Sequence, residues 1–161
     1  MNNPRIIADQ NMPHVEAYFG HLGEVKLMAG REIDSQTIQG AEILLVRSVT
    51  QVNQSLLEGS SVRFVGSATA GTDHIDLEYL NRNNIQFAYA PGCNAEAVVQ
   101  YALSVFSRLK PQWLESKVGI VGCGNVGGRL YQKLVALGVD CRVYDPFLSP
   151  SQIPDLVSFE Q

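Results

Sequence analysis

A glycine-rich turn has the residue types and spacing that point most directly to chemistry. Gly122-Cys123-Gly124-Asn125-Val126-Gly127 lies between the apolar run Lys117–Val121 and an amphipathic stretch. In this G-x-G-x-x-G pattern, Gly122 permits a tight strand-to-helix turn, Gly124 lets the backbone approach a pyrophosphate, and Gly127 lets the helix pack closely on the strand. The unpaired N–H groups of the helix's first turn favour an anion there. The pattern therefore predicts a dinucleotide site.

An acidic residue completes the pattern. Asp145 ends the next apolar run, Val139–Tyr144, about twenty residues after the glycine turn, the distance at which a carboxylate reaches the adenosine ribose. Ribose hydroxyls that donate to a carboxylate contribute about 1.5–3 kcal/mol each, whereas a 2′-phosphate would be repelled. The cofactor that this arrangement predicts is NAD.

The elements needed to position this site alternate between strand-like and helix-like runs. The expected strands are 5–8, 24–27, 43–46, 63–67 and 85–89, and the expected helical stretches between them are 14–22, 36–39, 53–57 and 77–83. This order predicts a parallel sheet covered on both faces. The expected fold class is α/β, a flavodoxin-like parallel-sheet domain followed by the start of a Rossmann domain.

Three parts of the chain follow from these runs: a domain over 1–93, a connecting helix over 94–110, and the beginning of a nucleotide-binding domain over 111–161. Asn94 is the expected helix cap and Pro111 the stop. The helix has a broad apolar face, which suggests burial either in the core or against a second subunit. After Asp145 only 16 residues remain, with no clear strand or helix. We therefore expect a fragment or a truncated copy.

Composition excludes several classes of partner. The chain has 161 residues, 45% of them apolar and 17% charged, with a net charge of −4 and no run of Lys or Arg. Neither nucleic acid nor an anionic membrane is an expected partner. No apolar run is long enough to span a bilayer and the first ten residues lack a signal-peptide core, so a cytoplasmic location is expected.

The cysteines and histidines do not form a recognisable site. Cys93, Cys123 and Cys141 are widely spaced and lack a C-x-x-C pair, which argues against disulfides and against a metal site. For Cys93 we favour a small half-buried residue over a reactive thiol. The three histidines share no ligand-like spacing: His14 and His21 are expected on the surface and His74 in a loop.

Several longer motifs occur in a fixed order: 9–13 (DQNMP), Val46-Arg47-Ser48-Val49-Thr50, then 69–76 (TAGTDHID), 90–95 (APGCNA) and 118–127 (VGIVGCGNVG). In this set the chain closely resembles the D-isomer-specific 2-hydroxyacid dehydrogenases over about residues 6–147. The resemblance implies oxidation of 4-phospho-D-erythronate at its 2-hydroxyl, with hydride transfer to NAD, in the biosynthesis of pyridoxal 5′-phosphate (vitamin B6). It also implies a homodimer in the full-length protein.

The resemblance assigns roles to single positions. Ser48 and Thr69 match substrate-binding positions, Asn125 and Val126 match backbone contacts to the pyrophosphate, and Asp145 matches the ribose ligand. Both Ser48 and Thr69 follow predicted strands, where open α/β sheets bind ligands, and each offers a hydroxyl donor to an oxyanion. Arg47 either pairs with a substrate phosphate or forms a surface ion pair.

The catalytic Arg, Glu and His of the family are expected beyond Gln161, so no catalytic residue is assigned and the chain by itself is expected to be inactive. The alternatives are another D-2-hydroxyacid dehydrogenase, such as one acting on phosphoglycerate, and a non-catalytic module that binds nucleotide or dimerises. A methyltransferase that uses S-adenosylmethionine also has a glycine loop after its first strand. Its fold begins with that strand, however, whereas five candidate strands come first here.

Overall fold

The structure is a computed structural model and describes residues 3–159. Contacts divide the chain into two compact units, Met1–Pro91 and Gly92–Gln161, and each unit is described by itself. The division into a substrate domain, a connecting helix and a cofactor domain stays a prediction.

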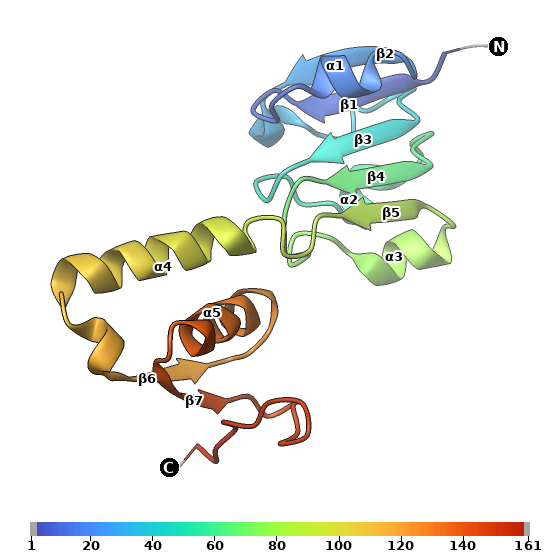
Figure 1. Cartoon of the computed structure of the whole chain (residues 1–161). Coiled ribbons are helices and arrows are strands. Elements are labelled where there is room, and N and C mark those ends of the chain that lie inside the picture. The colour runs from blue at the N-terminus through green and yellow to red at the C-terminus, as the bar shows by residue number, and fades with distance from the viewer. Residues whose placement is uncertain (1–2, 160–161) are drawn as a thin grey trace. The chain divides into compact units, whose positions relative to one another are not determined.

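The first unit is built on a parallel sheet (Figure 1). Its strands are β1 (Arg5–Asp9), β2 (Glu24–Met28), β3 (Ile43–Val46), β4 (Phe64–Ser67) and β5 (Gln86–Tyr89). Their order in the sheet is β2-β1-β3-β4-β5, and every neighbouring pair is parallel. The prediction of a flavodoxin-like parallel sheet is therefore confirmed. In such a sheet the strand order reverses beside β1, and ligands bind outside the carboxyl ends of the strands.

Short helices connect the strands: α1 (Val15–Phe19), η1 (Gly30–Glu32), α2 (Gln54–Leu57) and α3 (Leu77–Arg82). Side chains cap two of them, because Asn53 accepts a hydrogen bond from Leu56 N and Asp76 accepts one from Tyr79 N. The prediction of a helix at 36–39 was wrong. Asp34 accepts hydrogen bonds from the N–H groups of Gln36 and Thr37, and the resulting turn ends at Gly40, which has φ 73°.

The two faces of this sheet are covered unequally. One face packs Ile7, Leu44, Val46 and Val65 against residues of α2 and α3. The other packs Ile6, Ala8 and Leu45 against Val15 of α1. Beyond α1 this second face carries an apolar groove of about 270 Å³, lined by Met12, Phe19, Leu45, Phe64, Gly66, Ser67, Ala68, Ala88, Tyr89 and Ala90. The expectation that both faces are covered was therefore wrong for the β4–β5 side, since α1 spans only five residues.

The second unit begins with α4 (Ala95–Leu109) and η2 (Trp113–Glu115), and continues with β6 (Lys117–Val121), α5 (Asn125–Ala136) and β7 (Asp140–Tyr144). β6 and β7 pair in parallel, so the βαβ unit predicted around the glycine turn is present. Its core contains Ile120, Leu134 and Val143.

The segment after β7 returns along that strand. Val143 N donates to Asp155 O, Val157 N donates to Val143 O, and Leu156 forms an isolated parallel bridge with Val143. The Tyr131 hydroxyl of α5 donates to Asp155 Oδ2 at 2.8 Å. The segment that the sequence left without an element is therefore held against β7 by both backbone and side-chain bonds. Within residues 3–159, no helix has the length and apolar character needed to cross a bilayer.

Candidate functional site

The glycine turn stands where β6 meets α5, and two of its glycines are required by this chain's own backbone. Gly122 has φ 87°, a conformation that L side chains rarely adopt. A Cβ on Gly127 would lie 1.9 Å from the carbonyl oxygen of Gly122, so any side chain there would force the turn open. The backbone angle of Gly122 suits the tight turn expected there, and the close approach at Gly127 suits the expected packing of helix against strand.

Gly124 differs from its two neighbours. Its φ is −77°, and a Cβ there would meet no atom within 4 Å. Nothing in the described fold therefore requires glycine at this position. The open space beside it is where the sequence pattern expects the pyrophosphate to approach the backbone.

The first turn of α5 has three backbone donors without a hydrogen-bond partner in the described chain. Gly128 N bonds to Gly124 O, whereas the N–H groups of Asn125, Val126 and Gly127 have no acceptor among residues 3–159. α5 is 12 residues long, so its dipole adds a partial positive charge at this end. The start of α5 thus has the donors and the charge that suit a diphosphate.

Asp145 follows β7 directly and reaches back to the glycine turn. Its Oδ2 accepts a hydrogen bond from Cys123 N at 2.8 Å, and its Oδ1 accepts one from Phe147 N at 2.9 Å. These backbone bonds, the one from Cys123 first, hold the pKa of the carboxyl below its usual value. Each oxygen of the ionised carboxylate keeps a free lone pair, so the half-buried Asp145 can still accept from ribose hydroxyls.

The candidate substrate residues of the first unit follow neighbouring strands at their carboxyl ends. Arg47 and Ser48 come directly after β3, and Thr69 follows β4 by two positions. Ser48 is exposed. The carbonyl oxygen of Arg47 accepts a hydrogen bond from Thr50 N, but the Arg47 guanidinium forms no ion pair or hydrogen bond with any residue that the structure describes. The surface ion pair considered for Arg47 is therefore absent from the described part of the chain.

Thr69 belongs to a chain of hydrogen bonds that includes two buried side chains. Its hydroxyl donates to Gly71 O at 2.8 Å and lies 2.6 Å from the hydroxyl of Ser67. Ser67 Oγ also lies 2.8 Å from His74 Nε2. His74 is in a turn, as expected, but it is 6% exposed, and burial lowers its pKa while the Asp73 charge opposes that shift.

Sequence reasoning missed Ser67 altogether and did not place His74 beside Thr69. The available signal was weak, because a serine at the end of an apolar strand and a histidine seven residues later are separately unremarkable. Only the fold of the loop between them brings the two side chains together.

Asp9 begins one of the motifs noted in the sequence, but the sequence assigned it no role. It ends β1, where the strand order reverses, and it is fully buried. Its Oδ1 accepts from Asn11 N at 2.8 Å, while Oδ2 has no hydrogen-bond partner among the described residues. A Cβ on Gly30 would lie 2.4 Å from Oδ2, so this glycine makes room for the carboxylate.

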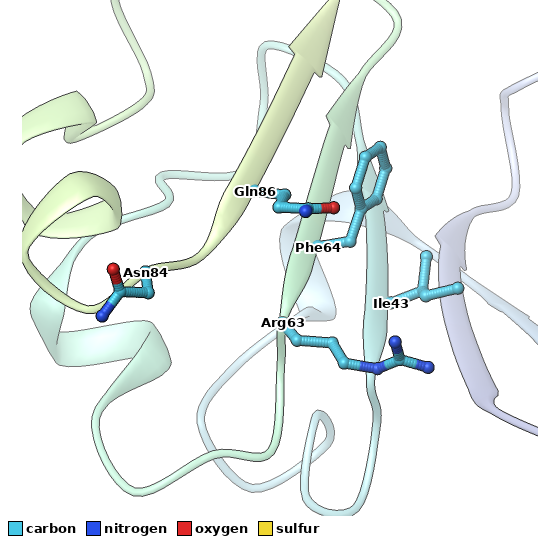
Figure 2. A pocket seen from close by; sticks show the side chains of 5 residues that line it. All are labelled: Ile43, Arg63, Phe64, Asn84 and Gln86. Atoms are coloured by element: carbon cyan, nitrogen blue, oxygen red, sulfur yellow. The ribbon is translucent and has the colours of Figure 1, made fainter.

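A cavity of about 320 Å³ lies at the end of the sheet opposite the candidate substrate residues. Figure 2 shows the side chains that line it, Ile43, Arg63, Phe64, Asn84 and Gln86. Ile43, Phe64 and Gln86 are the first residues of their strands, so the cavity lies at the amino ends. Arg63 is already paired with Glu42 at 2.9 Å. Neither its position nor its charge matches the site expected at the carboxyl ends.

The remaining predictions for single residues have mixed outcomes. His14 and His21 are exposed, as expected, whereas Cys93 is exposed and not half-buried. Cys93 follows Gly92, whose φ of 69° turns the loop, and it precedes the first buried residue of α4. In the described part of the chain, no group of three His, Cys, Asp or Glu side chains could hold a metal ion.

A family model, D-isomer specific 2-hydroxyacid dehydrogenase, catalytic domain, matches residues 6–153. The chain belongs to this family. The methyltransferase alternative is thereby removed. Two curated relatives, both named erythronate-4-phosphate dehydrogenase, come from Cellvibrio japonicus and Saccharophagus degradans. The first is 51% identical over 156 residues and the second 53% identical over 161 residues, and each match covers 97% of this chain.

The fold of this chain is found in solved structures. The NAD+-bound 3-phosphoglycerate dehydrogenase of Entamoeba histolytica gives a TM-score of 0.75 at 24% identity, over 97% of this chain and 57% of that chain. The D-lactate dehydrogenase of Aquifex aeolicus, solved with NAD and lactic acid, gives 0.71 at 18% identity, over 95% of this chain and 55% of that chain. These two dehydrogenases share the fold of this chain. The chain itself spans 41% and 43% of the length of the two curated relatives.

Proposed function

We propose that this chain serves the NAD-dependent oxidation of 4-phospho-D-erythronate at its 2-hydroxyl, a step of pyridoxal 5′-phosphate biosynthesis. One observation carries the proposal: the bond from Cys123 N to Asp145 Oδ2 joins the glycine turn after β6 to the carboxylate after β7. The groups suited to the diphosphate and to the ribose therefore lie side by side. The choice of substrate rests on the curated relatives, which are about half identical to this chain and named for it.

NAD would be held by the second unit and would accept the hydride. The free N–H groups of Asn125, Val126 and Gly127 would bind the diphosphate, with Gly122 and Gly124 leaving the backbone open to it. Asp145 would accept from the ribose hydroxyls. Because backbone bonds keep its carboxyl ionised, a 2′-phosphate at the same place would be repelled, and NAD would be preferred over NADP.

The substrate would be held by the loops that follow β3 and β4 in the first unit. Ser48 and Thr69 are the binding positions that the family resemblance assigns. Arg47 is the residue suited to the phosphate, because its guanidinium has no partner in the described chain and can bind phosphate in a bidentate manner.

We assign no general acid or base to this chain. Removal of a proton from a 2-hydroxyl needs a base with a pKa near neutrality and free access to the substrate. His74 does not meet this need, since it is buried and its Nε2 is already bonded to Ser67. The chain would therefore supply binding residues, and the family's catalytic Arg, Glu and His would have to come from elsewhere.

Two measurements on the 161-residue chain test the proposal. Titration should show NAD binding and weaker NADP binding, and Asp145→Asn should weaken NAD binding by about 10- to 100-fold, the equivalent of about 1.5–3 kcal/mol for hydrogen bonds to a charged group. Asp145→Asn keeps the size of the side chain but replaces one acceptor oxygen with an NH2 group, so one of the bonds from Cys123 N and Phe147 N is lost. An unfolding measurement on the variant therefore controls for damage to the turn. Equal affinity for NAD and NADP would contradict the assigned role of Asp145.

A turnover assay tests the remaining part. The chain incubated with 4-phospho-D-erythronate and NAD should produce no NADH, and robust NADH formation would overturn the assignment of its catalytic groups. Comparison of phosphoerythronate with phosphoglycerate as a ligand decides between the proposed substrate and the alternative one.

We further propose that the family's homodimer involves α4 and that the protein works in the cytoplasm. Tyr101 and Leu109 on α4 are 71% and 78% exposed, which leaves apolar surface for a partner. The three cysteines are all free thiols, as is usual in a reducing compartment. A strictly monomeric chain in sedimentation experiments would argue against pairing through α4, and also against the alternative that the chain is a non-catalytic dimerisation module.

A further inference from the structure

The three hydrogen bonds that link His74, Ser67, Thr69 and Gly71 O can all form together in only one direction. Thr69 has a single hydroxyl proton, and Gly71 O, which can only accept, takes it. The 2.6 Å contact between the two hydroxyls therefore needs the proton of Ser67. Ser67 then has no proton left for the 2.8 Å contact with His74, so His74 Nε2 must donate.

The direction runs from His74 Nε2–H to Ser67, from Ser67 to Thr69, and from Thr69 to Gly71 O. A neutral His74 carries its proton on Nε2 in this arrangement. The opposite tautomer, with the proton on Nδ1, would make Nε2 an acceptor and would reverse both hydroxyls, which would remove the donor from Gly71 O. Burial of His74 and Ser67, at 6% and 5% exposed, shields the bond between these two side chains from water, whereas the bond from Thr69 to Gly71 O lies at the surface.

This direction decides what Thr69 can offer to a ligand. Its proton is committed to Gly71 O and one of its two lone pairs is committed to Ser67, so a single lone pair is left. Thr69 was expected to donate to an oxyanion. With its proton committed, its hydroxyl can instead accept a hydrogen bond from a ligand's hydroxyl group.

We propose that His74 is a positioning residue which, through Ser67, holds the Thr69 hydroxyl as a hydrogen-bond acceptor, so that Thr69 selects a hydroxyl group of the substrate and not its carboxylate or phosphate. The proposal rests on the proposed function for the assignment of Thr69 to the substrate site. The direction of the hydrogen bonds is independent of that function.

The direction can be measured without a ligand. Nitrogen-15 NMR of the imidazole rings in the 161-residue chain should show His74 with its proton on Nε2 at neutral pH. The exposed His14 and His21 serve as references in the same molecule, since neither has a hydrogen bond in the described structure that fixes its ring. A proton on Nδ1 of His74 would overturn the proposal.

The role of Thr69 is measured with two ligands, 4-phospho-D-erythronate and 4-phosphooxybutanoate, which keeps the carboxylate and the phosphate but lacks both hydroxyls. Thr69→Val should weaken binding of phosphoerythronate by about 3- to 10-fold, as expected for one hydrogen bond, and should leave the affinity for the deoxy acid unchanged. Equal losses for both acids would overturn the acceptor role.

Two variants of His74 separate positioning from mere packing. His74→Gln keeps an N–H donor at nearly the same reach and should retain the preference for the hydroxylated acid, whereas His74→Leu should lose it to the same degree as Thr69→Val. If His74→Leu fails to fold, the ring NMR and the Thr69→Val comparison still decide the question. Failure of the unsubstituted chain to bind either acid would contradict both the proposed function and the selection by Thr69. The direction of the hydrogen bonds is tested separately, by the NMR measurement alone.

Discussion

At the scale of single residues, Gly124 and Gly127, the last two glycines of the nucleotide turn, should respond differently to substitution by alanine. Gly127→Ala should lower the free energy of unfolding by about 1–3 kcal/mol, because its Cβ would collide with the backbone carbonyl of Gly122. Gly124→Ala should leave stability nearly unchanged, since no atom lies within 4 Å, yet weaken NAD binding about tenfold or more by filling the space beside the diphosphate. Urea unfolding and NAD titration measure both effects. Unchanged NAD affinity in Gly124→Ala would place the diphosphate elsewhere.

His74 should make stability depend on pH in a predictable direction. Burial lowers its pKa in the folded chain below the ordinary 6.5, so the unfolded chain takes up this proton first as the pH falls. The free energy of unfolding should therefore decrease as the pH drops below about 6.5 and stop decreasing, for this group, below the folded pKa. Unfolding curves between about pH 7.5 and 5.5 should be flatter for His74→Gln than for the unsubstituted chain. Equal slopes would show that His74 is not held neutral.

At the scale of elements, the segment after β7 depends on α5 for part of its attachment. Tyr131→Phe keeps the buried ring but removes the hydroxyl that bonds to Asp155, a contact that also raises the pKa of Tyr131. The variant should be less stable by about 1.5–3 kcal/mol, as is typical for a hydrogen bond to a charged group. Hydrogen exchange at the Val157 N–H, which bonds to Val143 O, should become faster. A matched substitution at the exposed Tyr18 should change neither quantity.

At the scale of the whole molecule, ligand binding should stabilise the two units separately. Trp113 is the only tryptophan and lies in the second unit, so its fluorescence reports on the unit that holds the glycine turn. NAD at about a hundred times its Kd should add about 2.7 kcal/mol to the free energy of unfolding that is measured by Trp113 fluorescence. Slowly exchanging amides of β1 and β3 report on the first unit and should not respond to NAD. A response of equal size in both units would show that they unfold together.

The sequence by itself determined the elements that depend on local patterns. The five strands of the first unit begin within one residue of their predicted starts, and the turn from β6 to α5 follows from the glycines at 122 and 127, whose requirement lies in the adjacent backbone. Asp145 was found because a carboxylate at the end of the second strand has a recurrent spacing in nucleotide-binding folds. The short stretch 36–39 failed because one turn is too short for periodicity to distinguish a helix from a hydrogen-bonded turn.

Only the tertiary structure decided which part of the sheet's second face α1 leaves open, and which partners the polar side chains have. The bond from Cys123 N to Asp145 spans 22 positions, and the bonds that fix Thr69 depend on how the loop to His74 folds. Periodicity and propensity describe neighbours along the chain, whereas hydrogen-bond direction and burial depend on which atoms meet in space. For that reason the residues of the site were visible in the sequence, but the acceptor role of Thr69 was not.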